Sequence, residues 1–278
     1  MKWNIITDSS CDILELENPS EDITFASIPF VISVGNRDFV DDADLDVDEM
    51  VTAMEESKEG SHTSCPPPHA WYEQFEKPGY SIGVTISSNL SGSYNSAVVA
   101  RDMILEKDPD KKILLIDSHS AGPEIILIIR KLCKLISSGC DFDTVQEKIQ
   151  QYMQLTHIVF ALSSFNNLVK NGRMGKLTGF LAGKLGFWGI GIGSEQGTIE
   201  IKDKVRGSIK ALNVILNDMK ERGVEYKTVI ISHCQNAEFA EKLKAAIQEI
   251  WSSIEVTVNT TRGLCSYYAE RGGLLVGF

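Results

Sequence analysis

The sequence predicts a two-domain α/β protein, and three observations support this fold class. Residues 1–155 alternate apolar runs of strand length with segments of helical spacing, and the pattern changes after residue 155. Strand–helix–strand repetition implies right-handed crossovers and a mostly parallel sheet with flanking helices. A length of 278 residues is typical of two domains. We therefore expect an N-terminal α/β domain over residues 1–155 and a second α/β or α+β domain over residues 156–278.

The first domain contains apolar runs that we expect to be buried strands and amphipathic segments that we expect to be helices. The strands are Trp3–Thr7, Ile28–Val34, Ser81–Ile86 and Ile113–Ile116. The helices are Val47–Glu56, Tyr94–Glu106 and Glu124–Ser137, with a further helix whose aromatic face is Trp71, Tyr72 and Phe75. A polar amphipathic helix begins near Asp141 and ends near Thr156.

The second domain starts with a strand over Ile158–Ser163. A hairpin follows, because Gln196-Gly197 is typical of a turn and separates the apolar strands Trp188–Gly193 and Thr198–Lys202. The remaining elements are the helices Gly207–Arg222 and Ala237–Trp251 and the strands Lys227–His233, Glu255–Asn259 and Leu274–Phe278.

Composition excludes several classes of function. The net charge is −11 and the sequence pI is about 5.0, so phosphate backbones would repel the chain and nucleic acid is not an expected partner. The six cysteines and five histidines are scattered without the close spacing of metal ligands, so we expect no metal site. The weakly polar stretch Leu177–Ile192 is too short for a membrane span, and no signal-peptide pattern is found. We therefore expect a cytoplasmic protein without an integral membrane segment.

Polar clusters follow three of the predicted strands. They are Thr7-Asp8-Ser9-Ser10, Ser87-Ser88-Asn89 and Asp117-Ser118-His119-Ser120. The carboxyl ends of parallel strands meet at one edge of a sheet, where α/β proteins bind their ligands. Asp and Ser also cap helices, so each single cluster has a purely structural alternative. Their convergence nevertheless predicts a binding site at this edge.

The segment "TISSNLSGSYNSA" (residues 85–97) has the pattern of an anion-binding loop. It joins a strand to a helix, and the exposed N–H groups and dipole of a helix start favour a negative group. Gly92 permits close approach and Ser91 adds a neutral donor. The lysine of a nucleotide-binding loop is missing, so a carboxylate or a phosphate fits better than a nucleoside triphosphate. A second hydroxyl-rich loop, Gly60–Pro68, precedes the aromatic-faced helix.

An enzymatic function is the alternative to simple binding. The chain has no G-x-S-x-G elbow, and neither loop carries a general base beside its serine. Asp8-Ser9-Ser10 is similar to the Asp-x-Asp of aspartyl phosphatases, except that Ser10 stands in place of the second aspartate. A hydrolase or phosphatase that acts on an acyl or phosphoryl substrate stays open as the second hypothesis.

The motifs of this chain resemble those of DegV family proteins. The shared motifs, in order, are "IITDSSCDI", "IPFVISVGNRDFVDD", "HTSCPPP", "TISSNLSGSYNSA", "LLIDSHSAG", "KNGRMG" and "KVRGSIKAL". The resemblance covers nearly the whole chain and implies a two-domain fold that holds a long-chain fatty acid between and inside the domains. It also implies a non-catalytic subunit, without a cofactor, that presents the acyl carboxylate to a separate ATP-dependent fatty acid kinase subunit for acyl-phosphate formation.

The resemblance also assigns candidate site residues. The carboxylate would be bound by Thr63 of the first loop and Ser91 of the second, with Ser64 and Gly92 beside them. The acyl tail would lie largely in the second domain, with parts of Phe165–Phe187 in the wall. At ~0.8 kcal/mol per CH₂, burial of about sixteen carbons contributes on the order of 10 kcal/mol before opposing terms.

The chain departs from the family pattern near its C-terminus. Tyr268 stands where the family commonly has a histidine, so its hydroxyl becomes a candidate donor to the head group. Glu270 and Arg271 replace small residues, and we expect Arg271 to pair with Glu270 or with the ligand. A paralogue that binds lipid without a kinase is therefore a further alternative.

A set of cations forms a candidate partner-docking surface. Arg173 and Arg206 are the main candidates for contact with the kinase, and Lys176 and Lys204 accompany them. A solvated basic face without a partner is the alternative interpretation.

Overall fold

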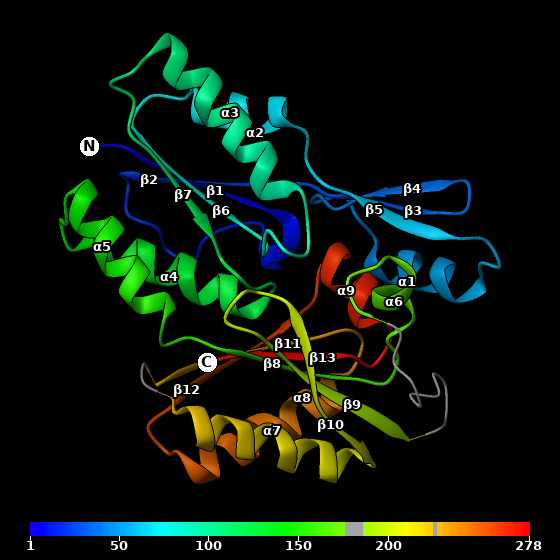
Figure 1. The fold of residues 1–278 in the computed structure, drawn as a ribbon. Helices are drawn as coiled ribbons and strands as arrows, with labels where there is room; N and C mark the ends of the chain where they lie inside the picture. The colour runs from blue at the N-terminus through cyan, green and yellow to red at the C-terminus, as the bar shows by residue number, and fades with distance from the viewer. Residues whose placement is uncertain (176–185, 225–226) are drawn as a thin grey trace.

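The computed structural model describes residues 1–175, 186–224 and 227–278. Two sheets lie one above the other, with helix α4 (Pro123–Ser137) between them (Figure 1). Helices α2 (Pro68–Phe75) and α3 (Ser93–Lys107) cover the outer face of the first sheet. Helices α7 (Ser208–Arg222) and α8 (Ala237–Ile250) cover the outer face of the second. The mixed α/β class predicted from the sequence is confirmed.

The first sheet is parallel, as the sequence pattern predicts. Its strands, in the spatial order β2-β1-β6-β7, are Ile23–Ile28, Trp3–Asp8, Tyr80–Thr85 and Ile113–Asp117. Every residue of β1 is buried because helices cover both faces. Trp3 and Ile5 pack toward α4 and α5 (Phe142–Met153), whereas Ile6 packs toward α2 and α3. Burial on both faces explains why β1 has apolar residues at the consecutive positions Ile5 and Ile6 rather than at alternate positions.

The predicted strand Ile28–Val34 is wrong as one element. Strand β2 ends at Ile28, and β3 (Val31–Val34) belongs to a separate antiparallel sheet of order β4-β3-β5. Pro29 lies at the break, and a proline has no N–H to continue a ladder. The Ser9 hydroxyl instead accepts a hydrogen bond from the Phe30 N–H at 3.0 Å.

The other strands of the small sheet had no sequence signal. They are β4 (Arg37–Val40) and β5 (Ser61–Ser64), each four residues long. Strand β5 contains no apolar residue, so apolar alternation could not reveal it. Helix α1 (Val47–Glu56) lies beside this sheet and begins at Asp46, whose carboxylate accepts a hydrogen bond from the Glu49 N–H.

The second sheet is mixed and has the order β10-β9-β8-β13-β11-β12. Its strands in that order are Ile199–Arg206, Phe187–Gly193, Ile158–Leu162, Leu274–Gly277, Thr228–His233 and Glu255–Thr260. Strands β11 and β12 run parallel, and the other neighbours run antiparallel. The predicted hairpin turn at Gln196-Gly197 is confirmed between β9 and β10.

Two short helices that the sequence pattern did not predict lie between the second sheet and the small sheet. They are α6 (Asn166–Lys170) and α9 (Gly263–Ala269). Helix α9 is almost wholly buried, so it has no amphipathic pattern. Across the described ranges, no helix combines the length and apolar character needed to cross a bilayer.

The turn between β9 and β10 joins the second sheet to the rim of the first. The Ser87 hydroxyl donates to the Gly197 carbonyl at 2.7 Å, and the Asn89 amide donates to the Gln196 carbonyl at 2.6 Å. Gly197 has a φ of +74°, and a Cβ there would lie 2.3 Å from the Ser87 Oγ. Glycine is therefore required at this contact.

A buried carboxyl group follows β1 and makes stability depend on pH. Asp12 adopts the left-handed conformation (φ 60°) and accepts a hydrogen bond from the Arg262 N–H at 2.7 Å. Burial raises the pKa of Asp12 to about 8. The folded protein therefore keeps a proton that the unfolded chain releases at about pH 4. The free energy of unfolding therefore decreases progressively as the pH rises from about 4 to about 8.

We expect Asp12→Asn to remove this pH dependence, because asparagine does not ionise and tolerates the left-handed conformation. At pH 8 the variant should unfold several degrees above the wild type, at roughly 2–4 °C for each kcal/mol gained. The difference should shrink toward pH 4.5. Thermal unfolding followed by circular dichroism at several pH values measures it, and a difference that is the same at every pH would contradict the assignment.

Candidate functional site

The polar clusters converge at one rim of the first sheet, as expected from parallel strands. Asp8 lies at its centre and is fully buried. Its Oδ2 accepts hydrogen bonds from the Ile86 N–H at 3.1 Å and the Ser93 hydroxyl at 2.6 Å. Its Oδ1 accepts from the backbone N–H and the hydroxyl of Ser10. Burial raises the pKa of Asp8, and the bonds from Ser10 and Ser93 partly offset that rise.

The Asp117 cluster is engaged within the same rim. The Asp117 carboxylate accepts hydrogen bonds from the Ser88 and His119 N–H groups at 3.0 and 3.2 Å. The His119 ring contacts the Glu195 carbonyl at 2.9 Å through Nδ1 and the Asp117 carboxylate at 3.5 Å through Nε2. These contacts hold two loops together and none of them caps a helix, because α4 begins after Gly122 without a side-chain cap. Both ring nitrogens of His119 are occupied by groups other than a serine.

An apolar cavity lies between the rim of the first sheet and the second sheet. The cavity has a volume of about 100 Å³, measured as the space open to the centre of a water molecule. This is several times the space that one buried water needs. The cavity wall is mostly apolar and is formed by loops at the rim of the first sheet, by the second sheet and by both short helices. It includes Phe30, Ile86, Phe160, Leu168, Leu264 and Leu275. Residues 176–185, part of the predicted tunnel wall, lie outside the described residues.

Hydroxyl groups from distant segments gather at this cavity. Thr63 of β5, Ser91 of the β6–α3 loop and Tyr268 of α9 all line it. The hydroxyls of Thr63 and Tyr268 lie 2.9 Å apart, so one donates to the other and one hydroxyl hydrogen remains available. The Ser91 oxygen accepts the Ser93 N–H at 3.2 Å, which leaves its own hydrogen free to donate. Burial raises the pKa of Tyr268, so the phenol is a neutral donor.

Arg173 is a cation in the wall of the same cavity. Its Nε donates to the Leu90 carbonyl at 3.1 Å and its Nη1 to the Asn171 carbonyl at 2.6 Å. Its guanidinium lies 5.9 Å from the centre of the Tyr268 ring. The sequence pattern suggested only a surface role for Arg173, because nothing local shows that its side chain reaches the β6–α3 loop.

The other predicted head-group residues lie beside the cavity. Ser64 is exposed because it alternates with Thr63 along β5. Gly92 precedes α3 with a φ of −73°, and a Cβ there would meet the Cys65 Sγ at an ordinary 3.5 Å. The fold of the protein itself therefore does not require glycine at position 92.

Arg206 and Lys204, two further predicted cations, lie away from the cavity wall. Arg206 is exposed at the end of β10, with its guanidinium 5.8 Å from the Phe187 ring centre, and Lys204 is exposed two residues earlier. Lys176 lies outside the described residues.

Arg271 does not pair with Glu270, and it does not line the cavity. Arg271 forms a two-point ion pair with Glu55 of α1, at 2.7 and 3.0 Å. The Glu270 carboxylate instead accepts the Asn167 N–H at 3.2 Å. Glu55 lies 216 positions away in the sequence, so no local pattern could identify it.

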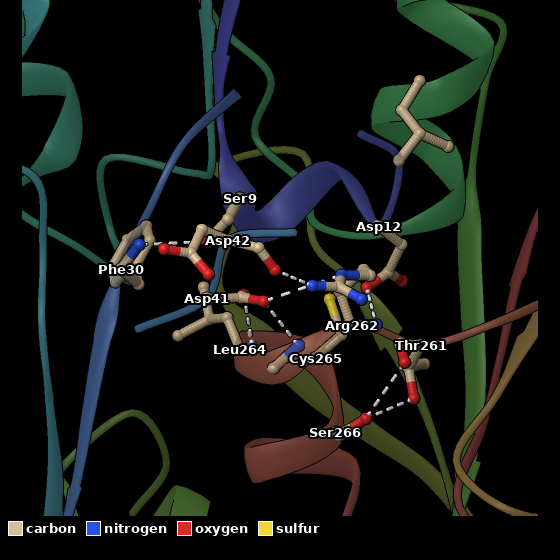
Figure 2. A network of polar contacts seen from close by, with 12 residues as sticks. Ser9, Asp12, Phe30, Asp41, Asp42, Thr261, Arg262, Leu264, Cys265 and Ser266 are labelled. Atoms are coloured by element: carbon tan, nitrogen blue, oxygen red, sulfur yellow. Dashed lines mark hydrogen bonds and ion pairs between the residues drawn. The ribbon is translucent and has the colours of Figure 1, made fainter. Parts of the chain in front are cut away.

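Helix α9, which carries Tyr268, depends on a buried carboxylate at its start (Figure 2). The two oxygens of Asp41 accept the Gly263 and Leu264 N–H groups, each at 2.8 Å. The Arg262 guanidinium donates to the Asp42 carbonyl beside it. A carboxylate at a helix start satisfies N–H groups that have no partner within the helix. Sequence analysis did not single out Asp41, although "DFVDD" is among the family motifs.

The hydroxyls of the site lack an activating base. Within the described ranges, no hydrogen bond joins Thr63 or Ser91 to a His, Asp or Glu side chain. Nucleophilic catalysis by serine requires such a partner. No three His, Cys, Asp or Glu side chains converge as metal ligands in the described part of the chain. The arrangement is suited to binding an anion with an apolar tail.

Comparisons with known proteins agree with this geometry. A model of the DegV family, described as uncharacterised proteins, matches residues 2–275. A DegV domain-containing protein of Streptococcus pneumoniae is 40% identical over 278 residues, which cover 100% of this chain and 99% of the relative.

Two solved structures are similar over nearly the whole chain. The fatty acid kinase B3 protein of Streptococcus pneumoniae, loaded with linoleic acid, matches with a TM-score of 0.97 and 40% identity over 100% of this chain and 99% of its own. A DegV family protein of Eubacterium eligens, loaded with heptadecanoic acid, matches with a TM-score of 0.94 and 37% identity over 99% of this chain and 98% of its own.

We expect Asp41→Ala to destabilise the protein by about 2–3 kcal/mol, because two buried N–H groups of α9 lose their acceptors. Asp44→Ala, which removes an exposed carboxylate from the same loop, should change stability by less than about 0.5 kcal/mol. Urea unfolding measures both variants. Equal stability of the two would show that Asp41 does not hold α9.

Proposed function

Because the chain belongs to the DegV family, we propose that it binds a long-chain fatty acid and presents the carboxylate to a separate ATP-dependent kinase subunit. That subunit would form the acyl phosphate. The observation that carries the proposal is the group of Thr63, Ser91 and Tyr268 hydroxyls in the wall of an otherwise apolar cavity.

The hydroxyl cluster is suited to a carboxylate that must stay reactive. A carboxylate accepts hydrogen bonds and donates none, and this wall offers the Ser91 hydrogen and one hydrogen from the Thr63–Tyr268 pair. Hydrogen bonds to a charged acceptor are stronger than those between neutral groups. If these neutral donors bind one oxygen of the carboxylate, its other oxygen stays free to attack a phosphoryl group. In this proposal Ser64 and Gly92 border the head group without contributing a side chain to it.

The apolar wall is suited to the tail. Leu90, Phe160, Leu162, Leu168 and Leu275 contribute to it from separate elements. Each CH₂ transferred from water contributes about 0.8 kcal/mol, so a chain of about sixteen carbons is retained strongly. The fatty acids in the two similar structures are of this class. The kinase step is supported by the relative whose description places it in a fatty acid kinase.

The two-domain division, with a boundary near residue 155, is part of the proposal. Residues 1–155 would supply the head-group loops with Thr63 and Ser91. Residues 156–278 would supply much of the acyl wall together with Tyr268. The cavity wall draws on both ranges, which is consistent with a ligand held between them.

Native mass spectrometry of the purified protein, followed by organic extraction, tests the proposal. One equivalent of a fatty acid is the expected result, and the extract identifies chain length and unsaturation. Added ATP should remain unconsumed until a kinase subunit is supplied. If the purified protein contains no fatty acid and takes up none when it is added, fatty-acid binding is refuted. A loaded protein that no kinase can use would favour a carrier without a kinase.

We expect the combined substitution Thr63→Ala and Ser91→Ala to lower fatty-acid affinity by at least tenfold. Each lost hydrogen bond to a charged group contributes about 1.5–3 kcal/mol. The matched control removes exposed hydroxyls at Thr52 and Ser253, and it should stay fully loaded. Lipid content by mass spectrometry is the measurement. A double variant as fully loaded as the control would show that the head group lies elsewhere.

We expect Arg206→Ala to leave fatty-acid content unchanged and to slow acyl-phosphate formation by a kinase subunit severalfold. Arg206 is exposed and lies outside the cavity wall, so its loss removes a cation from the proposed docking surface alone. Lys148→Ala, which removes an exposed cation from α5, is the control. Equal phosphorylation rates for both variants and the wild type would exclude Arg206 from docking.

A further inference from the structure

The Thr7–Ser10 motif at the end of β1 does not reach the cavity wall, yet it is the most buried polar segment of the rim. Asp8 and Ser10 have no exposed surface. The hydrogen-bonding partners of Asp8 are all neutral: two backbone N–H groups and the hydroxyls of Ser10 and Ser93. Burying a carboxyl group without a cation is costly unless its oxygens are fully bonded. Each oxygen of Asp8 accepts two hydrogen bonds, so the segments that donate them must keep their positions for the carboxyl group to stay satisfied.

One oxygen atom of Asp8 holds both ends of the loop that carries Ser91. Oδ2 accepts from the Ile86 N–H, directly after β6, and from the hydroxyl of Ser93, the first residue of α3. The loop between these two points is residues 87–92. Its ends are therefore fixed relative to each other and to β1.

The interior of the loop transmits this constraint to the Ser91 side chain. The Leu90 and Ser91 N–H groups both donate to the Ser87 carbonyl, at 3.0 and 3.1 Å. The Ser93 N–H donates to the Ser91 Oγ at 3.2 Å. Ser93 is the first residue of α3, so its N–H has no acceptor within the helix, and the Ser91 hydroxyl oxygen supplies one. The position of Ser93 thus determines which way the Ser91 hydroxyl hydrogen can point.

We propose that Asp8 acts through Ser93 as a positioning group that directs the Ser91 hydroxyl at the carboxylate of the ligand. The inference rests on the proposed function, because it presumes a carboxylate in the cavity. Asp8 would contribute to head-group recognition without touching the ligand. Asparagine has the same size but only one acceptor oxygen. In Asp8→Asn the NH₂ group therefore faces either the donors of Ser10 or those of Ile86 and Ser93, and the hydrogen bonds on that side are lost.

If Asp8 positions Ser91 through Ser93, substitutions at these residues should lower ligand affinity by an amount that depends on the head group of the ligand. With Ser93→Ala, the first residue of α3 loses its bond to Asp8, and Ser91 is less well aligned. A fatty acid should lose affinity, because its carboxylate depends on that alignment. The alcohol of equal chain length should lose little, because most of its affinity comes from the tail.

The test compares palmitic acid with hexadecan-1-ol on delipidated full-length protein, by displacement of a fluorescent fatty acid. Ser93→Ala and Asp8→Asn should weaken palmitic acid about five- to twentyfold and change hexadecan-1-ol by less than twofold. Ser81→Ala is the matched control, because it removes a fully buried hydroxyl of β6 outside the cavity wall, and this hydroxyl has no hydrogen-bond partner among the described residues. It should leave both ligands unchanged. If Asp8→Asn does not fold, Ser93→Ala alone decides the question.

A double-mutant cycle separates positioning from general loosening. In the Ser91→Ala background, Ser93→Ala should have no further effect on palmitic acid, because the hydroxyl that it positions is already gone. Equal losses of affinity for the acid and the alcohol would overturn the positioning role of Asp8 and Ser93. Additive losses of palmitic acid affinity in the cycle would overturn it as well. Failure of the wild type to bind palmitic acid would refute the proposed function instead.

Discussion

At the carboxyl end of β1, the Asp8 carboxylate brings three segments together: the start of the 3₁₀ turn at Ser10, the end of β6, and the first turn of α3. Its partners are neutral donors, so burial raises its pKa, and their geometry must be held to keep the group satisfied. The rim of the first sheet is consequently rigid where an α/β protein places its ligand.

A second buried carboxylate holds the helix that carries Tyr268. Asp41 accepts the first N–H groups of α9 (Figure 2). The same helix brings the Tyr268 hydroxyl to within 2.9 Å of the Thr63 hydroxyl. The Ser91 and Tyr268 hydroxyls therefore come from segments that buried acids anchor, whereas Thr63 lies on β5, which pairs with β3. The cation Arg173 is bonded to backbone carbonyls. Such a site offers an anion neutral donors, and it surrounds the ligand's tail with apolar side chains of the second sheet, the short helices and the loops at the rim of the first sheet.

Long, periodic elements were predictable, and short or fully buried ones were not. The parallel strands and the hairpin at Gln196-Gly197 follow from apolar runs and turn chemistry. Ile28–Val34 was misassigned because its composition suits a strand throughout, whereas Pro29 divides it between two sheets. Strand β5 and helix α9 have no periodic signal, since one is wholly polar and the other is buried almost all round. Yet these two elements supply Thr63 and Tyr268.

The sequence by itself determined the α/β class, the convergence of the polar clusters at one rim, and the loop at Ser91, because each depends on local spacing and on the direction of parallel strands. The resemblance to DegV proteins assigned Thr63, Ser91 and Tyr268 to one head group, and only the tertiary structure decided which side chains are in contact. Thr63 and Tyr268 are 205 positions apart, Arg271 and Glu55 are 216 apart, and Arg173 reaches a loop 83 positions away. Contacts at such separations are set by how the two sheets and the buried helices pack, and local sequence patterns contain no information about that packing.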